Sequence, residues 1–551
     1  GRLNSVQVLR VARDERYVSL MASLGRDFVE GTETVLAQAR RLSAADEQRT
    51  SAATRTGSSL SDLFTELFAS RTGGTSGTAT VGHRTIVGGV NADFFASTPT
   101  AGLPIGLHVQ DGEIVVSPNG RPAIGVTGDG SVVIGMPEMT GVVWRDELPE
   151  HLTSDDAGIV TSGMEELWLR AEINQVNRPP NGLGLVLYTP RYGTQTPPVQ
   201  GIVVTLRGVG GGITSGRTYT GVVAKVEEAP GLTSIRAAIP SDGVVLAARG
   251  TAEVLLESLT IGEWVQLRVD LAEPFADVQH AVAGWPILVQ DGVAVALNNG
   301  DALVSGRHPR TAVGMNDDYI FIVTADGRQP DWSEGMTLPE LAQVMLALGA
   351  TDAINLDGGG STTMVVRPPG EHQPVVVNRP SDGSERAVAN ALFVVSTAPS
   401  TPLQTLLVRP EAPAALAGAL VPLRLLGQDR YNNPVAVDAD EVVWSVRGSG
   451  DVVVVPTENG DIPALATREP GTVTVTARLG TVTGTAEVDV ISAVERIEVV
   501  PDIVHLAAGE SESLEVRAFD GDGRLVAVRP GQLAWSATTE QGSGTAVRVD
   551  A

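Results

Sequence analysis

The stretch "TLPELAQVMLALGATDAINLDGGGSTTMVV" (337–366) predicts a helix, a strand, a glycine loop and a second strand in succession. Thr337 and Glu340 have the spacing of a capping box, and apolar residues then recur at helical spacing until a glycine ends the pattern. "AINL" is typical of a buried strand. Three consecutive glycines weaken a packed element, because glycine loses the most backbone entropy on folding. We therefore expect the loop from Asp357 to Ser361 to serve a function that offsets this cost.

Length and composition indicate a strand-rich globular protein of several domains. The chain has 551 residues, which is too many for a single core. Apolar residues make up 42% and aromatic residues only 4%, and the abundance of Val, Thr and Gly favours short strands joined by turns. The net charge of −26 disfavours nucleic acid and anionic membranes as partners. No apolar run is long enough to predict a membrane span.

We predict an α+β fold, in which residues 1–396 form a strand-rich, mixed-sheet catalytic domain with a few helices. "RTAVGMNDDYIFIVTADG" (310–327) predicts a hairpin that turns at residues 316–318. The segment "STAPSTP" (396–402) is rich in Ser, Thr and Pro, as linkers are. We therefore place the end of the catalytic domain at this segment.

The C-terminal part of the chain contains an internal repeat. Three pairs of matching residues are each 91 positions apart: Pro410 and Pro501, Asp429 and Asp520, and Trp444 and Trp535. Each copy predicts an antiparallel sandwich with its tryptophan in the core. We expect an all-β Ig-like domain at 403–492 and a second, incomplete one at 493–551. Both resemble bacterial Ig-like repeats, which are spacers or adhesive stalks on secreted proteins.

Polar residues at the expected strand ends are the candidates for chemistry. In the glycine loop, Gly358, Gly359 and Gly360 would let a ligand approach backbone N–H groups, and Asp357 would project into the same space. The alternative is a tight turn with an ordinary turn aspartate. Further candidates stand in other stretches: Asn91 and Asp93 in "VNADFF", Arg310 and Thr311 in "RTAVG", Asp326 in "TADGRQ", and Arg386 and Asn390 in "ERAVANALFVV". Each of these alone is equally well explained as a packed or solvated residue.

Taken in order, these motifs resemble those of the phosphodiester glycosidase family. The resemblance spans about residues 5 to 396 and is carried by "NADFF", "AGWPILVQDG", "RTAVG", "DGRQ", "LDGGGSTTM" and "ERAVANALFVV". It implies a secreted or lumenal hydrolase that removes an α-linked N-acetylglucosamine from a phosphodiester. The residues that fall on family motifs are Asn91, Arg310, Asp326, Asp357, Gly358, Gly359, Gly360, Ser361 and Arg386. Thr311 and Asn390, which stand in two of the same stretches, are further expected substrate-binding residues.

We expect Asp357, paired with Asp93 or Asp326, to act as acid, base or nucleophile, while Arg310 and Arg386 hold a phosphate or carboxylate. The residues from Gly358 to Ser361 would line the sugar site. The resemblance implies that animal members of the family carry a small residue at the position of Asp93, whereas bacterial members vary there. An extra carboxylate there suits an ordinary glycoside, whose alkoxide leaving group needs a general acid, and it disfavours a nearby phosphate. Alternatively, Asp93 binds a sugar hydroxyl or orients one of the two arginines.

The preferred function is thus a secreted bacterial glycosidase that hydrolyses a sugar-1-phosphodiester or a related glycan linkage. One alternative is an ordinary glycoside hydrolase acting on a polysaccharide, and another is a non-catalytic glycan-binding surface protein. We expect a carbohydrate or sugar-phosphate partner, an extracellular or cell-surface location, and glycan or cell-surface contacts through the Ig-like repeats. With no cysteine and 7 histidines, we predict no metal site and no cofactor. Structural calcium at "NDD" (316–318) or "DGDG" (520–523) is the alternative to plain turns.

Overall fold

The computed structural model describes residues 3–44, 84–97, 101–146, 169–180, 182–229, 233–455, 462–505 and 510–535. The chain divides into two compact units. The first contains residues 1–367 and 373–398, and the second contains residues 368–372 and 399–551. The predicted α+β class is confirmed, because antiparallel sheets dominate and helices are few. The domain limits at 396, 403, 492 and 551 stay predictions.

The central sheet of the first unit contains the strand of the helix–strand–glycine loop stretch at 337–366. Its six strands are, in spatial order, β1 (Val6–Ala12), β19 (Tyr319–Ala325), β18 (Arg310–Met315), β20 (Asp352–Asn355), β16 (Ile287–Gln290) and β17 (Val293–Ala294). The predicted hairpin is confirmed, since β18 and β19 pair antiparallel. So is the predicted strand β20, which pairs with β18 on one side and β16 on the other.

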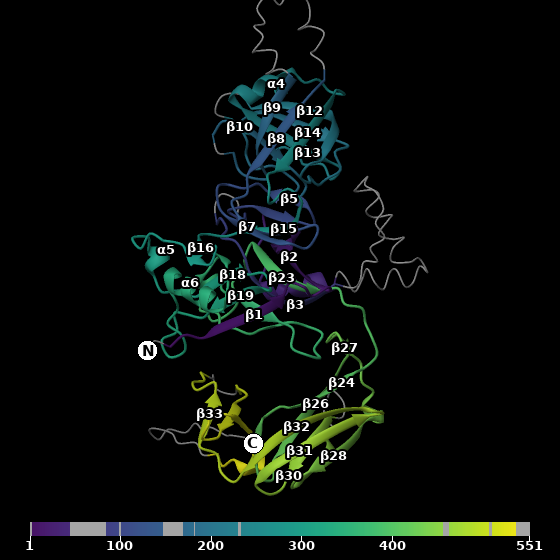
Figure 1. Ribbon diagram of the computed structural model, residues 1–551, viewed down its shortest axis with the longest axis vertical. Helices are drawn as coiled ribbons and strands as arrows, with labels where there is room; N and C mark the ends of the chain where they lie inside the picture. Colours follow the sequence, from purple (N-terminus) through teal and green to yellow (C-terminus); the bar gives the residue numbers. More distant parts are fainter. Residues whose placement is uncertain are drawn as a thin grey trace, which may run out of the picture. The chain divides into compact units, whose positions relative to one another are not determined.

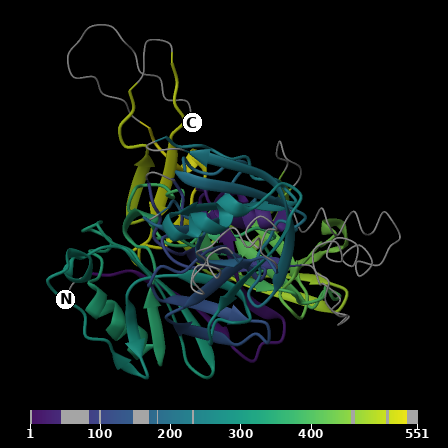
Figure 2. The same cartoon turned by 90° about the horizontal axis from the view of Figure 1, so that it is seen from above.

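Helix α6 (Leu338–Ala347) covers one face of this sheet, as Figures 1 and 2 show in teal. It begins at the predicted capping box: the Thr337 hydroxyl accepts from the Glu340 N–H, and the Glu340 carboxylate accepts from the Thr337 N–H. Leu338, Leu341 and Met345 are fully buried against the sheet. The short helix α5 (Ala302–Ser305) packs beside α6. The helix prediction is therefore confirmed with its cap and its apolar face.

Two further antiparallel sheets of five strands complete the body of this unit. One has the order β2 (Val18–Leu24), β23 (Asn390–Ser396), β3 (Thr85–Asn91), β21 (Met364–Val366) and β22 (Val375–Val376). The other has the order β5 (Glu113–Val116), β4 (His108–Gln110), β15 (Val278–Ala283), β6 (Ala123–Thr127) and β7 (Val132–Gly135). All three sheets contribute to one core, which includes Ile354, Leu392 and Ile124. This shared core fixes the strand ends of the three sheets relative to one another.

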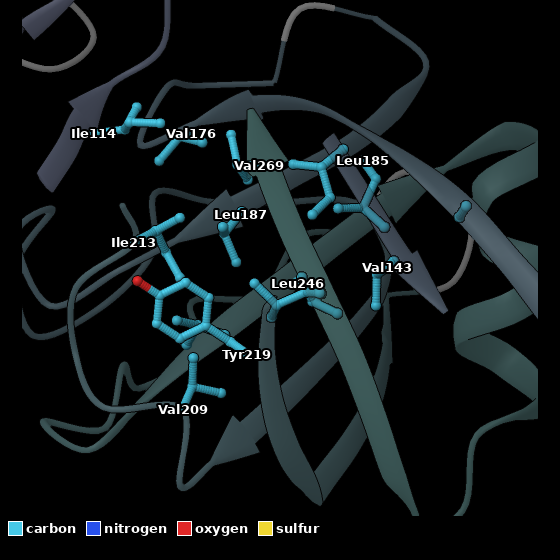
Figure 3. Close-up of a cluster of buried hydrophobic side chains, with 14 of the residues drawn as sticks. Ile114, Val143, Val176, Leu185, Leu187, Val209, Ile213, Tyr219, Leu246 and Val269 are labelled. Atoms are coloured by element: carbon cyan, nitrogen blue, oxygen red, sulfur yellow. The ribbon is translucent and has the colours of Figure 1, made fainter. Parts of the chain in front are cut away.

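Residues 139–271, in the middle of the first unit's sequence, contain the strands of a closed seven-stranded barrel. Its strands are β10 (Gly184–Tyr188), β13 (Gly243–Arg249), β11 (Gly201–Arg207), β12 (Thr218–Ala229), β14 (Trp264–Leu271), β8 (Met139–Trp144) and β9 (Arg170–Val176). Leu187, Leu246 and Tyr219 point into its interior (Figure 3). The turn η3 (Gly250–Ala252) and helix α4 (Glu253–Ser258) follow β13. Side chains fill the barrel, so its interior is a packed core.

The second unit consists of two sheets. One contains β24 (Thr405–Pro410), β26 (Leu420–Gln428), β30 (Ile462–Thr467) and β29 (Gly450–Val455), with β27 (Pro434–Val435) beside β26. The other contains β28 (Val443–Arg447), β31 (Gly471–Leu479), β32 (Val482–Ile491), β25 (Ala414–Leu416), β35 (Leu525–Ala527), β34 (Glu515–Phe519) and β33 (Arg496–Val500). Leu406, Val475 and Val488 lie in the core that the first copy of the repeat builds.

The repeat is visible in local structure. The side chain of Asp429 accepts from the N–H groups of Tyr431 and Asn433, and Asp520 accepts from those of Asp522 and Arg524. The 3-10 turns η5 (Ala439–Glu441) and η6 (Pro530–Gln532) also occupy matching places. The two tryptophans differ, because Trp444 packs against the core whereas Trp535 is half-buried outside the described apolar clusters. The Ig-like assignment itself stays a prediction.

Candidate active site

Three strand ends from two sheets meet at one point. Asp93 follows the end of β3, Asp357 follows the end of β20, and Asn390 begins β23. The Asp357 N–H donates to the carbonyl of Ala92 at 2.8 Å, and the Ala92 N–H donates to the carbonyl of Asn390 at 3.1 Å. These backbone bonds place Asp93 and Asp357 on neighbouring chain segments, although 264 positions separate them in sequence.

Asp93 is a buried carboxyl, and only one of its two oxygens accepts a hydrogen bond within the described part of the chain. Its Oδ2 accepts from the Gly106 N–H at 2.6 Å, while its own N–H donates to Asn390 Oδ1 at 2.9 Å. Its Oδ1 is buried and accepts no hydrogen bond from the described residues. Burial raises the pKa of Asp93 to about 7, and the Gly106 N–H and the guanidinium groups of Arg121 and Arg178 oppose that rise only in part. Asp93 is therefore partly protonated near neutral pH.

Asp357 is half-buried at the start of the glycine loop, and its Oδ1 accepts from the Gly358 N–H at 2.9 Å. Burial raises its pKa to about 6, against the lowering effects of the Ser361 hydroxyl, the Gly358 N–H and the charges of Arg386 and Arg121. The charge of Asp357 in turn raises the pKa of Asp93. The two carboxyls thus interact electrostatically and hold their protons at higher pH than ordinary aspartates do.

The predicted site residues Asn91, Thr311 and Asn390 form the frame that holds this pair. Asn91 Nδ2 donates to the carbonyl of Asp357 at 2.7 Å, and Asn91 Oδ1 accepts from Thr311 Oγ1 at 2.8 Å. All three residues are buried. They are thus placed to fix the backbone around the carboxyls. Their hydrogen bonds within the protein explain their presence without any contact with substrate.

His108 also lies beside this frame. Asn390 Nδ2 and His108 Nδ1 are 3.2 Å apart. Burial lowers the pKa of His108 to about 3, so the imidazole is neutral at physiological pH. His108 is not predicted from the sequence, because the residues around it form an apolar strand with nothing that marks a function.

The glycine triplet is required by the close approach of the protein's own arginines. A Cβ built on Gly360 would lie 2.1 Å from Nη2 of Arg386, and one built on Gly359 would lie 3.0 Å from Nη2 of Arg328. Gly359 also has a φ of +63°, which favours glycine. Arg386 is itself partly exposed and binds the Asp382 carboxylate through Nε and Nη2 at 3.0 and 2.6 Å. Two guanidinium groups therefore lie directly over the loop.

The predicted anion-binding nest is already partly used within the protein. The Gly358 N–H donates to the Asp357 carboxylate, and the Gly359 N–H donates to the carbonyl of Pro309 at 2.9 Å. These two groups are not free to bind a ligand. Ser361 is buried next to Asp357, in keeping with its predicted place at the site.

Arg310 was predicted to bind a phosphate or carboxylate, but its hydrogen bonds are made within the protein. Its side chain is 1% exposed, Nε donates to the carbonyl of Met336, and Nη2 donates to the carbonyls of Leu303 and Gly306, at 2.7 to 2.8 Å. A buried guanidinium that donates to three backbone carbonyls ties helix α5 and its C-terminal end to the segment before α6. This geometry favours a structural role over phosphate binding.

Asp326 likewise departs from the predicted catalytic role. Its carboxylate is fully buried and accepts from Asn378 Nδ2, the Arg379 N–H and Trp332 Nε1 at 2.9 to 3.2 Å. Donors within the fold therefore saturate both oxygens. Such a carboxylate orients the loop at residues 378–379. Of the two residues proposed as the catalytic partner of Asp357, the geometry therefore favours Asp93 over Asp326.

Two arginines near the carboxyls were absent from the predicted site. Arg178 is buried, with Nε and Nη2 donating to the carbonyl of Ser117 and Nη2 also to that of Gly106. Arg121 precedes β6 and lies with its guanidinium carbon 5.3 Å from the centre of the Phe94 ring. In the sequence, "NGRP" at 119–122 has the composition of an ordinary turn, which gives no signal of a site.

Within the described residues, no group of three or more His, Asp or Glu side chains is arranged to hold a metal ion. The described helices also include none that is long and apolar enough to cross a membrane.

Comparison with known proteins identifies the family of one segment. Residues 208–395 match the family model described as phosphodiester glycosidase. The match confirms the resemblance for this segment, which contains Asp357, the glycine triplet and Arg386, but it begins after Asp93 and Arg121. The expected resemblance from residue 5 to residue 207 stays a prediction.

The individual proteins that the chain resembles share low sequence identity with it or match only a short segment. Over 89 residues the chain is 38% identical to the SPbeta prophage-derived uncharacterized protein YomE of Bacillus subtilis (strain 168), a segment that covers 16% of this chain and 13% of that protein. A hypothetical protein from Synechocystis aligns with a TM-score of 0.49 and 19% identity, over 71% of this chain and 59% of that one. The zebrafish N-acetylglucosamine-1-phosphodiester alpha-N-acetylglucosaminidase catalytic domain, auto-inhibited by its pro-peptide, aligns with a TM-score of 0.28 and 14% identity, over 72% and 84%. The chain thus matches less than two thirds of the length of the first two proteins.

Proposed function

We propose, from the phosphodiester glycosidase match of residues 208–395, that the first unit hydrolyses a bond at the anomeric carbon of a sugar, with Asp93 and Asp357 as its catalytic pair. The observation that carries this proposal is the convergence of two carboxyls with pKa values raised to about 7 and about 6. Paired carboxyls of this kind are the working groups of most glycosidases. Perturbed acids gathered at strand ends favour a catalytic site over a passive binding surface.

The environments of the two carboxyls support a different role for each. Asp93, with the higher pKa, keeps its proton longer and is suited to be the general acid. Asp357 ionises first and is suited to attack the anomeric carbon or to activate a water molecule. The rate should then depend on pH as a bell, with limbs near pH 6 and pH 7, because Asp357 must be ionised while Asp93 is protonated.

A sugar-1-phosphodiester is the substrate class that we favour. Arg328 and Arg386 lie over the glycine triplet that follows Asp357, and their positive charge suits an anionic substrate. A protonated Asp93 also carries no charge, so it repels a phosphate less than an ordinary aspartate would. The extracellular location and a spacer or adhesive role for the C-terminal repeats are part of this proposal.

An ordinary glycoside hydrolase is the second candidate, and Asp93 is the observation that favours it. A phosphate monoester leaves as an anion with little need for a proton, whereas an alkoxide needs a general acid such as Asp93. Comparing turnover of a sugar-1-phosphodiester with that of an aryl glycoside of the same sugar separates the two. Glycan binding without release of any sugar from either substrate would leave a binding protein as the better description.

The decisive variant is Asp357→Asn, which keeps the size of the side chain and removes its charge. We expect turnover to fall by at least about a thousandfold, with circular dichroism unchanged. Asp317→Asn, an exposed carboxylate on the β18–β19 turn, is the matched control and should keep full activity. Full activity of the Asp357 variant would overturn the assignment.

A further inference from the structure

Arg121 is the cation whose charge acts on both members of the carboxyl pair. It lies in the turn between β5 and β6, and a Cβ built on Gly106 would come within 3.6 Å of its Cβ. Its guanidinium group rests on the ring of Phe94, the residue that follows Asp93. Its positive charge lowers the pKa of Asp93 and that of Asp357, so it acts on both carboxyls at once.

Arg121 nevertheless uses little of its hydrogen-bonding capacity within the protein. Nη1 is buried and donates to no acceptor among the described residues. Within the same part of the chain, no ion pair joins Arg121 to either carboxyl. The two comparable arginines are different, because Arg178 and Arg310 both donate to backbone carbonyls.

Asp93 likewise has an oxygen that takes part in no hydrogen bond within the described part of the chain. Asp93 Oδ1 is buried without a hydrogen bond from the described residues. Gly106 lies between the two side chains, since a Cβ built on it would come within 3.5 Å of Asp93 Oδ2 and 3.6 Å of Arg121 Cβ. A buried donor or acceptor that stays unpaired costs free energy, so native proteins rarely keep both. A group that accepts from Arg121 and also receives a hydrogen bond from protonated Asp93 would satisfy both. An oxygen of a bound substrate has that chemistry.

We propose that Arg121 binds the phosphate oxygen of the leaving group and makes the site prefer anionic sugar-1-phosphodiesters over neutral glycosides. The inference rests on the proposed function. In the reaction, water supplies the oxygen that bonds to the anomeric carbon, and the electron pair of the broken carbon–oxygen bond passes to the phosphate oxygen. The proton lost by water passes to the Asp357 carboxylate, while Asp93 keeps its own proton and shares it with the phosphate oxygen only as a hydrogen bond. Negative charge on the phosphate rises from one to two as the bond breaks, and a guanidinium group stabilises that increase.

The test compares Arg121→Gln and Arg121→Lys with wild type on two substrates of the same sugar, a phosphodiester and an aryl glycoside. We expect Arg121→Gln to lower kcat/KM for the phosphodiester by about ten- to a hundredfold, with a much smaller loss for the aryl glycoside. Arg121→Lys should recover part of that loss, because it restores the charge without the planar guanidinium group. The acid limb of the pH profile should also move to higher pH, since loss of the cation raises the pKa of Asp357.

Arg268→Gln is the matched control, because Arg268 is an exposed arginine on barrel strand β14 that pairs with Asp270. Equal losses on both substrates, or no loss on the phosphodiester, would refute the role of Arg121. If wild type turns over neither substrate, the proposed function fails by itself. Arg121 is then judged by calorimetry with a sugar 1-phosphate, and unchanged binding by Arg121→Gln would overturn the inference.

Discussion

Replacing Asp93 by asparagine should make the stability of the first unit less sensitive to pH. Burial raises the pKa of Asp93 from its ordinary 3.8 to about 7, so the folded chain keeps this proton over a range in which the unfolded chain has lost it. The stability that the protonated group confers is fully present below pH 3.8 and is lost as pH rises toward 7. Asparagine is neutral throughout and carries no such dependence.

The size of the effect follows from the shift. A difference of about three pH units at about 1.4 kcal/mol per unit gives a full loss of about 4 kcal/mol in the free energy of unfolding. Part of that loss has already occurred at pH 5. Between pH 5 and pH 8, wild type should therefore lose about 2.5 kcal/mol more than Asp93→Asn. Asparagine can still accept from the Gly106 N–H through its amide oxygen, so the variant keeps the hydrogen bond that wild type makes.

Urea unfolding at pH 5, 6, 7 and 8 measures this difference. Subtracting wild type from the variant at each pH cancels the titrating groups that do not interact with Asp93, including His108, whose lowered pKa has the opposite effect on stability. Asp317→Asn serves as the control and should parallel wild type, because its carboxylate is exposed. Parallel curves for wild type and Asp93→Asn would show that Asp93 is ionised in the folded protein at pH 8 without cost, and the general-acid assignment would fail with it.

Two further predictions concern the supports of the site. Arg310→Met should lower the free energy of unfolding by about 2–4 kcal/mol, because it leaves the part-buried carbonyls of Leu303 and Gly306 without the donor they have in wild type and removes one of the two donors to the carbonyl of Met336, whereas Arg268→Met should have little effect in the same denaturation assay. Gly360→Ala should reduce kcat/KM by on the order of tenfold or more, since its Cβ must displace the side chains of Arg386 and Asp382. Gly128→Ala, which meets only ordinary contacts, is its control, and a fully active Gly360 variant would show that the arginine's position is immaterial.

The local fold could be predicted wherever the sequence carries short-range signals. The helix α6, its capping box, the β18–β19 hairpin and the strands around the glycine loop all follow from periodicity and turn chemistry within a few residues. The closed barrel could not be predicted, because its strands pair across long separations and any of several orders satisfies the same alternation. Sequence alternation also cannot show that β9 and β10 pair in parallel.

The site could be predicted only in part, for a related reason. Asp93 and Asp357 were found because each follows an apolar strand and belongs to a motif. Motif membership also selected Arg310 and Asp326, whose polar atoms turn out to be used within the fold. Sequence position does not show whether a buried charge is already satisfied. That distinction depends on which carbonyls and amides approach it from distant segments.

The glycine triplet shows why the missing information is tertiary. From sequence, three glycines after a strand suggest backbone N–H groups open to a ligand, yet two of those groups donate to Asp357 and Pro309. The absent side chains instead make room for Arg328 and Arg386, which come from loops elsewhere in the chain. The conformational cost of the triplet is therefore offset by bringing two cations against the loop that holds Asp357. Any Cβ at Gly360 would separate that positive charge from the carboxylate, and for this reason the loop cannot be explained by its own sequence alone.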